Sequence, residues 1–76
     1  MNPLEVSAVK AEDAESVRAL LDSLLDHCIA TGASDLHLTS HRPPYVRLHG
    51  ELQPMDEIGV LPPTVIESIA RSITTL

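Results

Sequence analysis

Aromatic residues are almost absent from this 76-residue chain, which has no tryptophan, no phenylalanine and one tyrosine, Tyr45. Proteins that bind single-stranded nucleic acid stack several rings against the bases, so this mode of binding is excluded. Basic residues are also few, with five against eleven acidic residues and a net charge of −6. Because a phosphate-binding surface needs clustered cations and these are scattered, we expect neither nucleic acid nor an anionic membrane surface as a partner.

Cysteine and long apolar runs are equally scarce. The single cysteine, Cys28, cannot form an intramolecular disulfide, which favours a reducing compartment. The N-terminus lacks the cationic start and apolar run of a secretory signal. No apolar run approaches the roughly 20 residues that span a bilayer. We therefore expect a cytoplasmic protein without direct membrane insertion.

A nucleotide-binding loop is also missing from the sequence. Such a loop has the pattern G-x-x-x-x-G-K-[S/T], in which backbone amides and a lysine hold the phosphates. The glycines at 32, 50 and 59 are far apart, and the only lysine, Lys10, has no glycine near it. We therefore predict that this chain does not hydrolyse ATP by itself.

Side chains for metal or nucleophilic chemistry are present but poorly spaced. Zinc needs three or four converging ligands, and the chain has no C-x-x-C or H-x-x-x-H pattern. A site combining Asp35 with His37 and His49 is conceivable, so a small metal-dependent enzyme remains an alternative. Cys28 falls on an apolar stripe, where a thiol is usually inert. We predict no catalytic residue, metal ligand or cofactor in this chain.

The clearest predicted element is a helix over residues 13–31. Acidic residues near its start suit the helix dipole, and Gly32 suits a left-handed C-terminal cap. Residues 1–12 show little periodicity, and we expect a flexible lead-in there. Apolar residues recur every three or four positions of the helix and form one stripe that is typical of packing on a sheet: Val17, Leu20, Leu21, Leu24, Leu25, Cys28 and Ile29.

Alternation of apolar and polar residues predicts three short strands over 35–39, 45–49 and 51–55, separated by a diproline loop and a turn at Gly50. They would form an antiparallel sheet with one apolar and one polar face. The apolar face would carry Leu36, Leu38, Val46, Leu48 and Leu52. The polar face would carry Asp35, His37, Thr39, Tyr45, Arg47, His49 and Gln53.

A second helix is predicted to begin at Pro62 and Pro63, after a loop over residues 56–60, because a missing N–H is tolerated at a helix start. Its apolar stripe would consist of Ile66, Ile69, Ala70 and Ile73. The predicted order is helix, three strands, helix. This order defines an α+β fold.

The stretch Gly32–Met55 resembles part of a known family. It reads GASDLHLTSHRPPYVRLHGELQPM, and it is similar to the small domain that precedes the ATPase core in type IV pilus retraction ATPases (PilT-like) of the type II/IV secretion ATPase superfamily. The most specific match is ASDLHL, followed by Pro43-Pro44, Arg47 and Gly50. The likeness extends from about Leu20 to the end and implies a PAS-like fold over 13–76. Because that fold continues with further strands in the family, we expect a partial domain, truncated before its last strands.

The resemblance implies a non-catalytic domain of a hexameric motor that powers pilus retraction (twitching motility) or related secretion. Each small domain would pack on the ATPase domain of a neighbouring subunit and transmit ATP-driven motion. ATP and Mg²⁺ would belong to that ATPase domain, outside this chain. The motor would act in the cytoplasm, at the inner face of the membrane through the pilus or secretion machinery. A free-standing PAS-like interaction or regulatory module is the alternative.

The predicted polar sheet face is the candidate interface in this interpretation. Its interface residues would be Asp35, His37, Arg47 and His49, with Arg47 foremost, because a guanidinium is a rigid fork suited to carboxylates. An open sheet edge also invites pairing with a second copy of the chain. Both expectations concern contacts between proteins and require no chemistry from the side chains.

Overall fold

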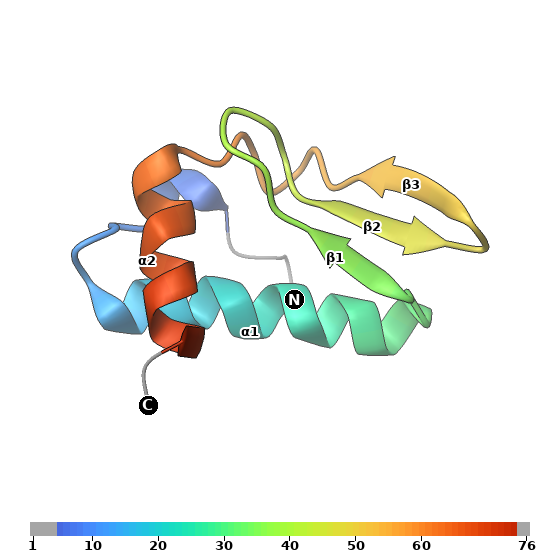
Figure 1. The fold of residues 1–76 in the computed structure, drawn as a ribbon, viewed down its shortest axis with the longest axis horizontal. Helices are drawn as coiled ribbons and strands as arrows, with labels where there is room; N and C mark the ends of the chain where they lie inside the picture. Colours follow the sequence, from blue (N-terminus) through green and yellow to red (C-terminus); the bar gives the residue numbers. More distant parts are fainter. Residues whose placement is uncertain (1–4, 75–76) are drawn as a thin grey trace.

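Two helices and a three-stranded antiparallel sheet form the fold of residues 5–74, the part of the chain that the computed structural model describes (Figure 1). The predicted α+β order is therefore confirmed, although each strand is one or two residues shorter than predicted. The elements are η1 (Val6–Ala8, a 3-10 turn), α1 (Ala14–Thr31), β1 (Asp35–His37), β2 (Tyr45–Leu48), β3 (Glu51–Pro54) and α2 (Pro63–Thr74).

Both ends of α1 are capped, and the cap at Gly32 is the one that the sequence predicts. The Asp13 carboxylate accepts a hydrogen bond from the Glu15 backbone N–H at 3.2 Å, which satisfies one of the free amides of the first turn. Gly32 adopts the left-handed conformation at φ 76° and donates its N–H to the Cys28 carbonyl. The cap stops the helix, so that the chain turns directly into β1.

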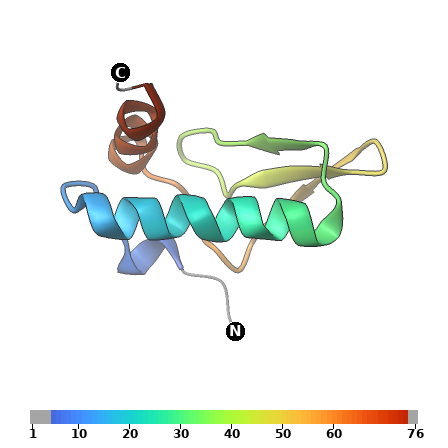
Figure 2. The same cartoon turned by 90° about the horizontal axis from the view of Figure 1, so that it is seen from below.

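The apolar stripe of α1 is only partly buried. Val17, Leu20, Leu21 and Leu24 are in the core, but Leu25 and Ile29 are 45% and 80% exposed. The prediction that these two residues share the packed face is wrong. At 3.6 residues per turn they lie roughly 90° and 130° around the helix from the centre of the buried line. Figure 2 shows α1 running along the underside of the sheet.

A two-residue turn joins β2 to β3. His49 and Gly50 both have positive φ, 52° and 82°, as a type I′ hairpin turn requires. His49 is therefore a turn residue, and its predicted place on the polar sheet face is wrong. Leu48 pairs with Glu51 on either side of the turn.

The register of β3 also reverses the predicted faces of two residues. Leu52 lies opposite Arg47, and Gln53 lies opposite Val46. Directly opposed residues point to the same side of a sheet. Leu52 therefore shares the polar face, and Gln53 shares the face that bears Val46. The prediction treated Gly50 alone as the turn, and the second turn residue shifts the alternation by one position.

Irregular segments contribute much of the core. Met55, Ile58 and Leu61 are 2%, 1% and 0% exposed, and Ile58 lies within residues 56–60, which were predicted as a loop. Val6 of η1 is also buried, and its N–H donates to the Ile58 carbonyl at 2.7 Å. The segment predicted as a lead-in therefore contains a 3-10 turn whose Val6 belongs to the core, while residues 1–4 lie outside the described part of the chain.

The second helix packs against α1, as Figures 1 and 2 show from two sides. Val65 and Ile69 are buried, but Ala70 and Ile73 of the predicted stripe are exposed. The buried line therefore begins one residue earlier than predicted. Within residues 5–74, neither helix combines the length and the apolar character that a membrane-crossing segment requires.

Candidate interaction face

An ion pair joins the two strands that carry the predicted interface residues. Arg47 Nε donates to Asp35 Oδ2 at 3.1 Å, and Arg47 Nη1 donates to the Gly50 carbonyl at 3.3 Å. The Ser34 hydroxyl donates to the same Asp35 oxygen at 3.0 Å. The Arg47 and Asp35 side chains are 37% and 50% exposed, so solvent screens their attraction and the pair adds at most about 1 kcal/mol to stability. Its main effect is to hold Arg47 in one orientation.

The register places six side chains on one surface of the sheet, which we call the outer face. Asp35 lies opposite Arg47, and His37 lies opposite Tyr45. On the other side of β2, Arg47 and Tyr45 lie opposite Leu52 and Pro54. The members are Asp35, His37, Tyr45, Arg47, Leu52 and Pro54.

Three of the four predicted interface residues therefore come together. Asp35, His37 and Arg47 share the outer face, whereas His49 occupies the hairpin turn. Sequence reasoning missed Leu52, which is 47% exposed on this face. A His-Gly turn of two residues was the available signal, because it fixes the alternation of the strand that follows.

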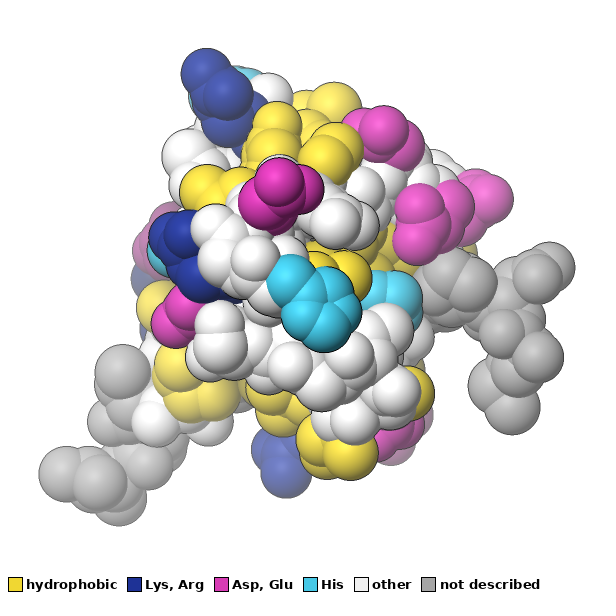
Figure 3. All heavy atoms as spheres, turned by 90° about the vertical axis from the view of Figure 1, so that its right-hand side faces the viewer, with side chains coloured by type: hydrophobic (Ala, Val, Ile, Leu, Met, Phe, Trp, Pro, Cys, Tyr) yellow, Lys and Arg dark blue, Asp and Glu magenta, His cyan; other side chains and the backbone are white. Residues whose placement is uncertain are grey.

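The outer face carries little net charge although the chain carries −6. Its one acidic residue, Asp35, is paired with its one arginine, Arg47. A surface with few unpaired charges, an aromatic residue and an arginine has the composition that is typical of protein–protein contacts. Figure 3 looks onto the hairpin end of the molecule, where apolar side chains are exposed between charged ones.

The remaining motif residues form the scaffold of this face. Pro44 is among the fully buried residues, and its carbonyl accepts a hydrogen bond from the Met55 N–H at 2.8 Å. Two backbone hydrogen bonds fix the loop before Pro44: the Leu61 N–H donates to the Arg42 carbonyl at 2.9 Å, and the Leu61 carbonyl accepts from the His41 N–H at 2.7 Å. The diproline motif thus fixes where β2 begins.

The histidines and the cysteine are candidates for a metal site. In residues 5–74 no group of three His, Cys, Asp or Glu side chains is placed to hold a metal ion. Cys28 is half-buried on α1, and this burial raises the pKa of its thiol above the ordinary value of 9.0. The nucleophilic thiolate is therefore less populated at neutral pH than in an exposed cysteine.

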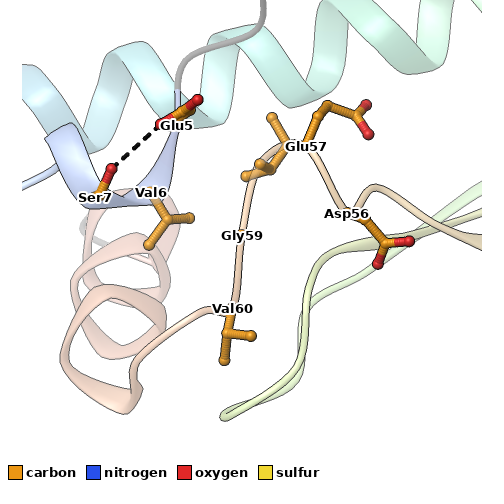
Figure 4. Close-up of a pocket in the computed structure, with 8 residues that line it drawn as sticks. Glu5, Val6, Ser7, Asp56, Glu57, Gly59 and Val60 are labelled. Carbon is orange, nitrogen blue, oxygen red and sulfur yellow. Dashed lines mark hydrogen bonds between the residues drawn. The ribbon is translucent and has the colours of Figure 1, made fainter.

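A shallow groove of about 390 Å³ lies between η1 and residues 56–60 (Figure 4). Val6, Ile58 and Val60 supply its apolar surface, and Glu5, Asp56 and Glu57 line it with carboxylates. The Ser7 hydroxyl donates to Glu5 at 3.4 Å. The groove is formed by segments outside the sheet, so it shares no residue with the outer face.

No family model, curated protein or solved structure matches this chain. The resemblance to PilT-like ATPases therefore stays a prediction from the motif residues.

Proposed function

We propose that this chain is the non-catalytic, PAS-like N-terminal domain of a PilT-like hexameric motor ATPase. Its outer face would dock on the ATPase domain of a neighbouring subunit and transmit ATP-driven motion to it, in pilus retraction or related secretion. The observation that best supports this proposal is the link between Asp35, Arg47 and Gly50. Three separate positions of the family-like motif meet there through two hydrogen bonds of one side chain.

A domain that transmits motion must move as one body. The hydrogen bonds of Arg47 join β1, β2 and the hairpin turn, and Pro44 and Met55 fasten the other end of β2 to the end of β3. Displacement of the outer face would therefore be passed to the whole sheet and to the helix packed on it. Such rigid-body motion of small domains is a common form of switching.

Nucleotide would be bound by the ATPase domain and not by this chain. Gly32 ends α1, Gly50 lies in the hairpin turn and Gly59 follows the turn over residues 56–58. Each glycine serves a different turn, so these three do not together form a phosphate-binding loop. The residues present do not fit ATP and Mg²⁺, and no catalytic step is assigned to them.

The proposal is tested by mixing the chain with the ATPase core of a PilT-like motor produced without its own first domain. Isothermal titration should show binding of the wild-type chain. Arg47→Ala should weaken this binding about tenfold or more, because central arginines are frequent interface hot spots. Arg18→Ala is the matched control, since Arg18 is also in an exposed ion pair, with Asp22 on α1, but lies outside the sheet.

Three results would contradict the proposal. The wild-type chain would fail to bind the core, Arg47→Ala would bind no differently from Arg18→Ala, or Arg47→Ala would unfold the domain. The last outcome would make the arginine a structural residue. A thermal melt followed by circular dichroism separates it from loss of binding.

A further inference from the structure

β3 has a free edge. The strand order is β1-β2-β3, so within residues 5–74 β3 pairs with β2 on one side only. All four of its residues are exposed. Met55 directs its N–H to Pro44 on the β2 side, and backbone groups alternate in direction along a strand. The backbone N–H and C=O groups of Glu51 and Gln53 therefore also point toward β2, while the backbone groups of Leu52 and Pro54 point away from the sheet.

Proline restricts what this edge can accept. Leu52 offers an outward N–H and an outward carbonyl, but Pro54 offers only a carbonyl because it has no N–H. Prolines at this position are a common device against uncontrolled edge pairing. A strand that adds to β3 must therefore form its reciprocal pair of hydrogen bonds at Leu52.

We propose that this edge binds a second copy of the chain, with the two β3 strands antiparallel and Leu52 on the two-fold axis. Leu52 of each copy then donates its N–H to the Leu52 carbonyl of the other. The two Leu52 side chains, each 47% exposed in the monomer, meet on the outer faces of the joined sheets. Pro54 of each copy lies opposite Gly50 of the other, where no side chain obstructs its ring.

The neighbouring registers are disfavoured by the same residues. A shift that pairs Glu51 with Glu51 of the second copy places like charges directly opposite, which destabilises a sheet. The opposite shift pairs Leu52 with Pro54, so that the Leu52 carbonyl meets a residue without an N–H. With Leu52 on the axis, each Glu51 instead lies opposite a Gln53, and its carboxylate can accept a hydrogen bond from the amide.

Charge substitutions in this register give the test, because Gln53 would lie opposite Glu51 twice in each dimer. Sedimentation velocity over a concentration series should show reversible dimerisation of the wild-type chain, measured at about 0.15 M salt, where charges more than about 8 Å apart are screened but directly opposed side chains are not. Gln53→Lys should tighten the dimer about tenfold and Gln53→Glu should weaken it about tenfold, from two opposite or like charge pairs. The double substitution Glu51→Lys with Gln53→Glu should restore tight association.

The controls are Ala19→Lys and Ala19→Glu, which make the same changes in net charge on an exposed position of α1. The Ala19 variants should dimerise like the wild-type chain. A wild-type chain that stays monomeric at all concentrations would overturn the proposal. So would Gln53 variants that behave like their Ala19 counterparts, or a double substitution that fails to restore association, because the contact would then lie elsewhere.

Discussion

Ile58→Ala should destabilise the domain strongly, and Ile29→Ala should leave its stability almost unchanged. The sequence pattern suggests the reverse, because it places Ile29 on the apolar stripe of α1 and Ile58 in a loop. Ile58 is 1% exposed in a turn after β3, whereas Ile29 is 80% exposed although it belongs to the apolar stripe of α1. Truncating a buried isoleucine to alanine removes about 2–5 kcal/mol of stability. A domain of 76 residues has about 4–11 kcal/mol in total, so Ile58→Ala should remove a large share of it.

Thermal unfolding followed by circular dichroism measures this difference. A loss of about 3 kcal/mol at Ile58 corresponds to a fall in Tm of about 12–24 °C in a domain of this size. Ile29→Ala should leave Tm nearly unchanged or raise it slightly, because alanine favours the helix by a few tenths of a kcal/mol over isoleucine. If both variants lost similar stability, or if Ile29→Ala lost more, the conclusion that Ile58 lies in the core and Ile29 at the surface would be refuted.

Further predictions concern the ends of α1 and its cysteine. Gly32→Ala should cost about 1 kcal/mol in urea unfolding, because φ is 76° and the added methyl group meets open space, so that only the backbone conformation is penalised. Asp13→Ala should lower the free energy of unfolding by about 1 kcal/mol, because the cap to the Glu15 N–H is lost. Asp13→Asn should keep most of the stability, because an asparagine oxygen can also accept this hydrogen bond. Because burial raises the pKa of the Cys28 thiol above 9.0, folding favours the protonated form. The contribution of Cys28 to stability should be constant below pH 9 and be lost as the pH rises through the folded pKa, and Cys28→Ala should remove this contribution from the pH dependence of urea unfolding.

Local signals predicted α1, its C-terminal cap and the order of the elements. Gly32 and the stripe from Val17 to Leu24 act within one or two turns of chain, so their effect does not depend on the rest of the fold. The prolines and Gly50 similarly mark the ends of strands. The α+β class and three of the four proposed interface positions follow from such short-range patterns.

The missed features depend on contacts between distant segments. Nothing near Ile58 in the sequence indicates that Val6 covers it, because that contact joins residues 52 positions apart. The exposed state of Ile29 depends on which part of α1 the sheet covers. Leu52 was assigned to the wrong face because the alternation was carried through the turn, and a turn of two residues with positive φ, 52° at His49 and 82° at Gly50, resets it.

The register that the two-residue turn sets therefore determines which side chains each surface of β3 presents. An extra residue between Leu48 and Glu51, with the turn kept at two residues, would shift the register by one position and exchange the sides of Leu52 and Gln53 without altering the composition of the strand. A homologous chain with such an insertion should consequently carry its leucine and glutamine in swapped order.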